Sequence, residues 1–99
     1  MIMFPVTNFH TGDVEPVYEV MQDPATIIGL GDGGAHCGQI CDASMPTFML
    51  THWTRDRTAG EKFPLEWAVR RISSETADFF GFKDRGRLQP GKKADVNII

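Results

Sequence analysis

The stretch ATIIGLGDGGAH, residues 25–36, carries the strongest structural signal in the chain. It begins as a continuous apolar run and stops on a carboxylate, Asp32, that two glycines follow. Because apolar and polar residues do not alternate in the run, it predicts a strand over 25–30 that is buried on both faces, as in a parallel sheet. Ligands of barrels and open α/β sheets bind beyond the carboxyl ends of such strands, so Asp32 is the candidate active-site acid.

The two glycines after Asp32 fit such a site. Gly33 and Gly34 would let the backbone turn sharply and a substrate approach closely, which makes both of them candidate substrate-binding residues. Taken by itself, an Asp followed by glycines is also a common turn sequence, in which Asp32 would be a turn residue and not a catalyst.

A helix is predicted directly before this strand. Asp13 is a suitable N-cap, Pro16 lies in the first turn, and Asp23-Pro24 ends the helix. A helix followed closely by a strand is half of a βαβ unit, which predicts an α/β fold with a parallel sheet. One face of this helix carries apolar residues at helical spacing: Val14, Val17, Tyr18 and Met21.

Three further helices and a strand are predicted downstream. A helix capped by Ser44 or Asp42 begins near Pro46 and ends around residues 55–57, and a polar loop follows over 58–62. The next helix starts at Pro64, and a short helix after it ends at Gly81 as its C′ glycine. The predicted core and packing residues are Phe48, Met49, His52, Trp53, Leu65, Trp67, Ala68, Val69, Ile72, Ala77, Phe79 and Phe80. Pro90-Gly91 predicts a turn, and Val96, Ile98 and Ile99 a final strand.

Composition excludes several classes of protein. The 99 residues have a formal net charge of −3, and their basic side chains are interleaved with acidic ones, so we expect no nucleic-acid partner. No apolar stretch approaches the roughly 18 residues of a membrane span, and the first residues lack the features of a signal peptide, so we expect a cytoplasmic protein with no membrane partner. The 99 residues are too few for a complete (β/α)8 barrel, which needs roughly 250 residues.

Several motifs together resemble the C-terminal part of an amidohydrolase-superfamily enzyme, most closely the N-acyl-D-amino-acid deacylases, or D-aminoacylases. They are Gly29-Leu30-Gly31-Asp32-Gly33-Gly34-Ala35-His36, Ile40-Cys41-Asp42-Ala43-Ser44, Thr51-His52-Trp53, Arg55-Asp56-Arg57 and Pro90-Gly91-Lys92-Lys93-Ala94-Asp95-Val96. The resemblance implies an α/β fold, the C-terminal fragment of a metal-dependent (β/α)8 barrel with one strand of the flanking β-sandwich. Residues 1–86 would be the barrel segment and residues 87–99 the start of the sandwich strand.

The resemblance also implies a reaction, the hydrolysis of the linear amide C–N bond of small-molecule N-acyl amino acids. Asp32 would be the catalytic carboxylate that accepts the water proton and passes a proton to the departing amine, and in a complete enzyme it would bind the metal. Zinc would polarise the carbonyl and lower the pKa of water. The acyl group, side chain and stereochemistry of the substrate do not follow from the sequence.

Departures from the family pattern predict that this chain alone is inactive and binds no zinc. The family's His-x-His pair, its bridging metal ligand and its two later histidines are absent, and His10, His36 and His52 are isolated. A zinc hydrolase site normally has three protein ligands and a water. Gly31 also stands where relatives often have serine.

Two other residues are candidates for substrate binding. His36 follows the glycines and either faces the substrate or is a hydrogen-bonded structural histidine. Arg55, with Arg57 near it, either pairs with a substrate carboxylate or lies exposed at a helix end, where a positive charge complements the helix dipole.

Two alternatives to a hydrolase segment stay open. The first is a small zinc-binding module built on His36, Cys37, Cys41 and Asp42, although buried reduced cysteines explain the same cluster. The second is a non-catalytic, self-associating protein, because the exposed edges of an incomplete barrel favour a homo-oligomer.

Overall fold

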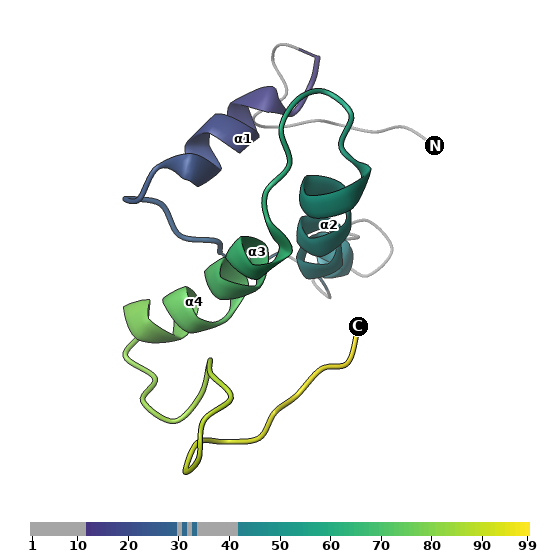
Figure 1. Ribbon diagram of the computed structural model, residues 1–99. Helices are drawn as coiled ribbons and strands as arrows, with labels where there is room; N and C mark the ends of the chain where they lie inside the picture. The colour runs from purple at the N-terminus through teal and green to yellow at the C-terminus, as the bar shows by residue number, and fades with distance from the viewer. Residues whose placement is uncertain (1–11, 30, 32, 34–41) are drawn as a thin grey trace.

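The computed structural model describes residues 12–29, 31, 33 and 42–99. These residues form a set of short helices without a β-strand among them (Figure 1). In chain order the elements are α1 (Glu15–Gln22), the 3-10 turn η1 (Asp42–Ser44), α2 (Met45–Thr51), the π-helical turn η2 (His52–Asp56), α3 (Leu65–Ile72) and α4 (Ser74–Phe79).

The predicted strands are wrong for the residues that the structure describes. Residues 26–29 have no regular secondary structure, and the amide of Thr26 donates to the carbonyl of Asp23 at 3.0 Å, which closes a turn. A strand exists only through a ladder of hydrogen bonds to a second strand. A parallel strand would have its partners far away in sequence, and the described part of the chain supplies none.

Helix α1 confirms the local signals read from the sequence. It spans Glu15–Gln22, has a proline in its first turn and ends at Asp23. The N-cap differs from the prediction, because Val14 occupies this position and no side chain caps the helix, while Asp13 Oδ1 accepts a hydrogen bond from the Glu15 amide at 3.0 Å. The predicted apolar face is also correct, because Met21 is buried and its neighbours Val14, Val17 and Tyr18 pack against the core.

The second predicted helix is present and ends where expected. Its α-helical part, α2, passes directly into η2, where the amide of Arg57 donates to the carbonyl of His52 at 2.9 Å, five residues back. Ser44 occupies the N-cap position, but its side chain makes no capping bond. Along this helix Met49 and Trp53 are buried as predicted, whereas Phe48 is exposed.

Helices α3 and α4 confirm the positions of the breaks but only part of the predicted core. Ala68 and Ala77 are buried, while Leu65 and Val69 border an open groove between α3 and residues 86–89. At the end of α4, Gly81 has a φ of +74°, and the next amide, that of Phe82, donates to Ala77 O at 2.8 Å. This is the Schellman arrangement that a C′ glycine permits.

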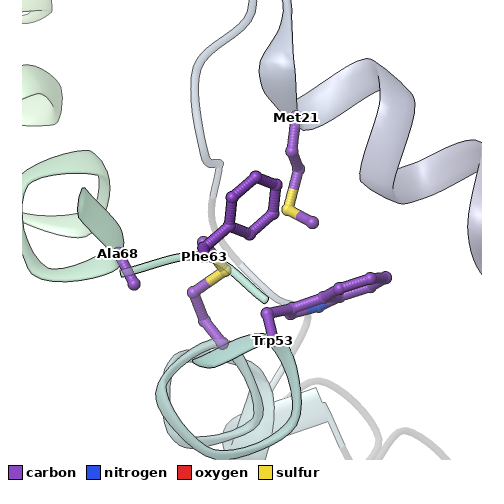
Figure 2. Packing of buried hydrophobic residues seen from close by; sticks show 5 residues of the cluster. Met21, Trp53, Phe63 and Ala68 are labelled. Atoms are coloured by element: carbon purple, nitrogen blue, oxygen red, sulfur yellow. The ribbon is translucent and has the colours of Figure 1, made fainter. Parts of the chain in front are cut away.

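The core lies where α1, α2, η2 and α3 meet the loop before α3 (Figure 2). Phe63 is at its centre, stacked on Tyr18 at 4.4 Å and on Trp67 at 3.9 Å between ring centroids. The predicted packing role of Trp53 and Trp67 is therefore confirmed. The same prediction is wrong for Phe79 and Phe80, which are 69% and 62% exposed.

After α4, residues 82–99 form an irregular chain (Figure 1). Its predicted turn is present, since the Lys92 amide donates to Gln89 O at 3.1 Å and Gly91 has a φ of +83°. The Lys93 amide, donating to Asp84 O at 2.7 Å, ties this turn to the loop after α4. Val96, Ile98 and Ile99 stay exposed, because no second strand lies beside them in the described part.

In the described part of the chain, no helix has the length and apolar character to cross a membrane.

Candidate functional site

The described structure contains two of the five predicted site residues, Gly33 and Arg55. Asp32, Gly34 and His36 lie outside the described residues, and so do Cys37 and Cys41 of the alternative zinc cluster. The site is therefore built from the residues that flank Asp32 in the sequence and from the helices that hold them.

Gly33, the residue directly after Asp32, packs against the start of the second helix. A Cβ placed on Gly33 would lie 2.7 Å from the Cα and 2.8 Å from the amide nitrogen of Ala43 in η1. Both are backbone atoms, which cannot rotate away as a side chain could. The sequence predicts glycine here for a tight turn and for substrate approach, and the structure adds a third requirement, this close contact between two backbones.

Thr26, at the other end of the same stretch, is held by a buried arginine. Arg71 of α3 donates from Nη2 to Thr26 Oγ1 at 2.9 Å and to the carbonyl of Met21 at 3.3 Å. Its Nη1 donates to Glu75 Oε2 at 2.9 Å. Arg71 could not be identified from the sequence, because its two contacts with residues 21–26 join positions that are 50 and 45 residues apart.

Arg55 is an accessible cation at the end of η2. Its side chain is 70% exposed, and its guanidinium donates to both carboxylate oxygens of Asp56, at 2.6 and 2.9 Å. The hydrogen bond from Arg55 holds the pKa of Asp56 below its usual value, so the pair persists at neutral pH and is lost as the pH falls through that lowered pKa. A substrate carboxylate would have to take the place of Asp56, and the assignment of Arg55 to substrate binding stays a prediction.

Arg57 is a different kind of residue from Arg55. It is 3% exposed, and its guanidinium pairs with Glu15 of α1 while lying 3.9 Å from the centroid of the Tyr18 ring. It also donates to the carbonyls of Ala59 and Glu61. These contacts make Arg57 a structural residue that joins the loop after η2 to α1, in contrast to the exposed or substrate-facing arginine expected from the sequence.

A metal site cannot be built from the described residues. Among residues 12–29, 31, 33 and 42–99, no three His, Cys, Asp or Glu side chains are grouped so that they could hold an ion. His52, the one histidine in these ranges, stacks on Phe48 at 4.7 Å and meets Trp53 edge to face at 4.8 Å. The donors that the structure describes thus do not fit a zinc site by themselves.

Comparison with known proteins gives one match. A model of the amidohydrolase family matches residues 3–99, nearly the whole chain. No curated protein and no solved structure matches the sequence.

Proposed function

Because this chain belongs to the amidohydrolase family, we propose that it is a segment of an enzyme that hydrolyses the linear amide bond of N-acyl amino acids. The proposal rests on one observation, the family match that extends across the Asp32-Gly33-Gly34 stretch. The preference for D-amino acids is part of the proposal and derives from the resemblance to D-aminoacylases.

Asp32 is the proposed general base and acid of this reaction. It takes a proton from the attacking water as the oxygen bonds to the amide carbon. When the C–N bond breaks, the same carboxyl returns a proton to the leaving nitrogen, so that a carboxylic acid and an amine are released. An unprotonated amide nitrogen is a poor leaving group, which is why one group must move the proton between the two sites.

The family's metal would need ligands beyond the described residues. Zinc, when bound in a complete enzyme, would polarise the substrate carbonyl and activate water, and Asp32 is the proposed ligand from this segment. Because the sequence has no His-x-His pair and its three histidines, His10, His36 and His52, are isolated, we expect the 99-residue chain alone to be without turnover.

The test is a substrate series given to a version of the protein that carries a complete barrel. We expect it to release free amino acid from N-acetyl-D-amino acids faster than from their L-enantiomers, and the 99-residue chain to release none, as measured by amine-reactive fluorescence. In the same series, Arg55→Met should raise KM for substrates with a free carboxylate and leave KM unchanged for the matching amides. A complete barrel that hydrolyses other amides but no N-acyl amino acid would contradict the proposed substrate class.

A second proposal, self-association of the isolated chain, is favoured by exposed aromatic side chains after α4. Phe79, Phe80 and Phe82 form an aromatic ridge, with ring centroids 5.1 Å apart for the first pair and 6.3 Å for the second. Two charged pairs lie beside it, Asp78 with Arg87 and Asp84 with Arg85. An exposed aromatic patch of this kind suits contact with the same patch on a second copy.

Substitution of the ridge should weaken this association. We expect sedimentation of the 99-residue chain to show a mass that rises with concentration, and Phe80→Ser to raise the dissociation constant about tenfold. Leu88→Ser is the matched control, because Leu88 is an exposed apolar residue outside the ridge. A chain that stays monomeric at all concentrations, or an equal effect of both variants, would refute the ridge as the contact.

A further inference from the structure

An open groove lies between the helices and the C-terminal segment. Its larger part has a volume of about 660 Å³ and extends from α2 and α3 to residues 93–99. Its smaller part, of about 490 Å³, lies between α3 and residues 86–89. The two parts are continuous, because they share the lining residues Val69, Ser73, Gly86, Arg87 and Leu88. Both volumes fall in the range of small-molecule sites, about 300–1,000 Å³.

Apolar side chains line the larger part of the groove on two sides. On the helical side they include Leu50 of α2, and Val69 and Ile72 of α3. On the side of the C-terminal segment they include Leu88 and Ile98, which are 77% and 98% exposed. The groove is thus open to solvent, and an aliphatic chain laid in it would remove apolar surface on both sides from water.

The loop that forms one wall of the groove is fixed against α4. A Cβ on Gly86 would lie 2.6 Å from the Cβ of Ala77 and 3.2 Å from the carbonyl oxygen of Ser73, so glycine lets the loop lie directly on α4 and the residue before it. Arg87, the next residue, donates to both carboxylate oxygens of Asp78 in α4, at 2.8 and 2.5 Å. The wall is therefore in place without a ligand, as is usual for small-molecule sites.

Positive charge exceeds negative charge around the larger part of the groove. Arg85, Arg87 and Lys93 line it, whereas Asp95 is the one acidic side chain among its described lining residues. Arginine has five N–H donors, and Arg87 uses two of them for Asp78. Its other donors have no partner in the part of the chain that the structure describes, and the planar guanidinium suits a second carboxylate.

From the apolar walls and the excess of cations, we propose that the groove binds an aliphatic carboxylate, with its head group on Arg87 and its chain along Val69 and Ile72. Arg87 borders both parts of the groove, so a carboxylate bound there leaves the chain room to extend into the larger part. A small polar anion would leave the apolar walls uncovered, and an aliphatic cation would meet the guanidinium with like charge. The proposal does not depend on the proposed function, because binding in this groove involves no hydrolysis.

The test is an NMR titration of the 99-residue chain with sodium octanoate below its micelle concentration. The amide signals of Gly86 and Leu88 report on the groove, and the indole signals of Trp53 and Trp67 report on the core. Octylammonium carries the same chain on a cation, and acetate carries the same head group without the chain. We expect octanoate to shift both amide signals to saturation, octylammonium to bind about tenfold more weakly, and acetate to give no saturable shift.

Substitutions at the head-group and chain positions should weaken octanoate binding separately. Arg87→Met and Val69→Ser are each expected to raise the Kd about tenfold with the indole signals in place. Lys83→Met is the matched control for charge and Val20→Ser for an exposed valine, since neither residue lines the groove, and both should keep the Kd within about twofold. Val69→Ser tests the groove without touching the contact of Arg87 with Asp78.

Several results would overturn the proposal. Octylammonium that binds as tightly as octanoate would exclude recognition of the head group, and acetate that binds as tightly would exclude a role of the apolar walls. Equal effects of the test and control variants, or no saturable shift at all, would exclude the groove as the site. If the Gly86 and Leu88 signals move with protein concentration before octanoate is added, a second copy occupies the groove. If octanoate binds only to Ile98→Ser, the C-terminal segment itself fills it.

Discussion

Asp32→Asn is expected to lower kcat by about 10²–10⁴-fold in a version of the protein with a complete barrel, the usual contribution of a positioned acid–base group. Asparagine has nearly the same shape as aspartate but neither accepts the water proton nor returns one to the amine. The loss should therefore appear in kcat at saturating substrate. The measurement is steady-state hydrolysis of an N-acetyl-D-amino acid by both proteins.

The control for this substitution is an aspartate outside the proposed site. Asp84 is exposed, is paired with Arg85 at 2.8 Å and lies in the loop after α4, so Asp84→Asn should leave kcat unchanged. Thermal unfolding of both variants shows whether the fold is intact. Asp32→Asn with turnover close to that of the unchanged protein would remove Asp32 from the mechanism, whatever the effect at Asp84.

The elements that could be predicted from the sequence depend on residues close together in the chain. The proline in the first turn of α1, the break at Asp23 and the Schellman ending at Gly81 each involve positions within five residues of one another. Their physical causes are backbone preference and local hydrogen bonding, which act whatever the rest of the fold does.

The strands and part of the core depend on partners that are distant in sequence. An apolar run such as residues 25–29 becomes a strand only when a second strand pairs with it, and the described residues contain none. Phe79 and Phe80 have the same apolar character as Phe63, yet only Phe63 is buried. Helical spacing shows which residues share a face, but the segment that covers that face lies elsewhere in the chain.

The candidate site divides in the same way. Gly33 could be proposed from the sequence because a glycine after Asp32 has a recognisable local purpose, and its part in substrate binding stays a prediction. Arg71 could not be identified, since its contacts are with Thr26 and Met21, which only the fold brings near it. Arg55 and Arg57 are two positions apart and look alike in the sequence, but one is 70% and the other 3% exposed.

Because Arg57 is buried and Arg55 is exposed, we expect substitution of Arg57 to have a large effect on stability. Arg57→Met should lower the free energy of unfolding by about 2–4 kcal/mol, because it removes the donor to the carbonyls of Ala59 and Glu61 and separates Glu15 from its buried partner. The exposure of Glu15, 37%, keeps the cost below that of a fully buried pair. Urea unfolding followed by tryptophan fluorescence measures it, provided that the m-value is unchanged.

Arg55→Met is the matched control, since it removes the same charge two residues away from an exposed pair, and it should cost less than about 1 kcal/mol. Glu15→Gln separates charge from packing, because it removes the carboxylate and leaves the contact of Arg57 with Tyr18. It should therefore destabilise less than Arg57→Met. Equal urea midpoints for Arg55→Met and Arg57→Met would mean that the contacts of Arg57 do not hold the 57–63 loop against α1. The core around Phe63 would then hold this loop without Arg57.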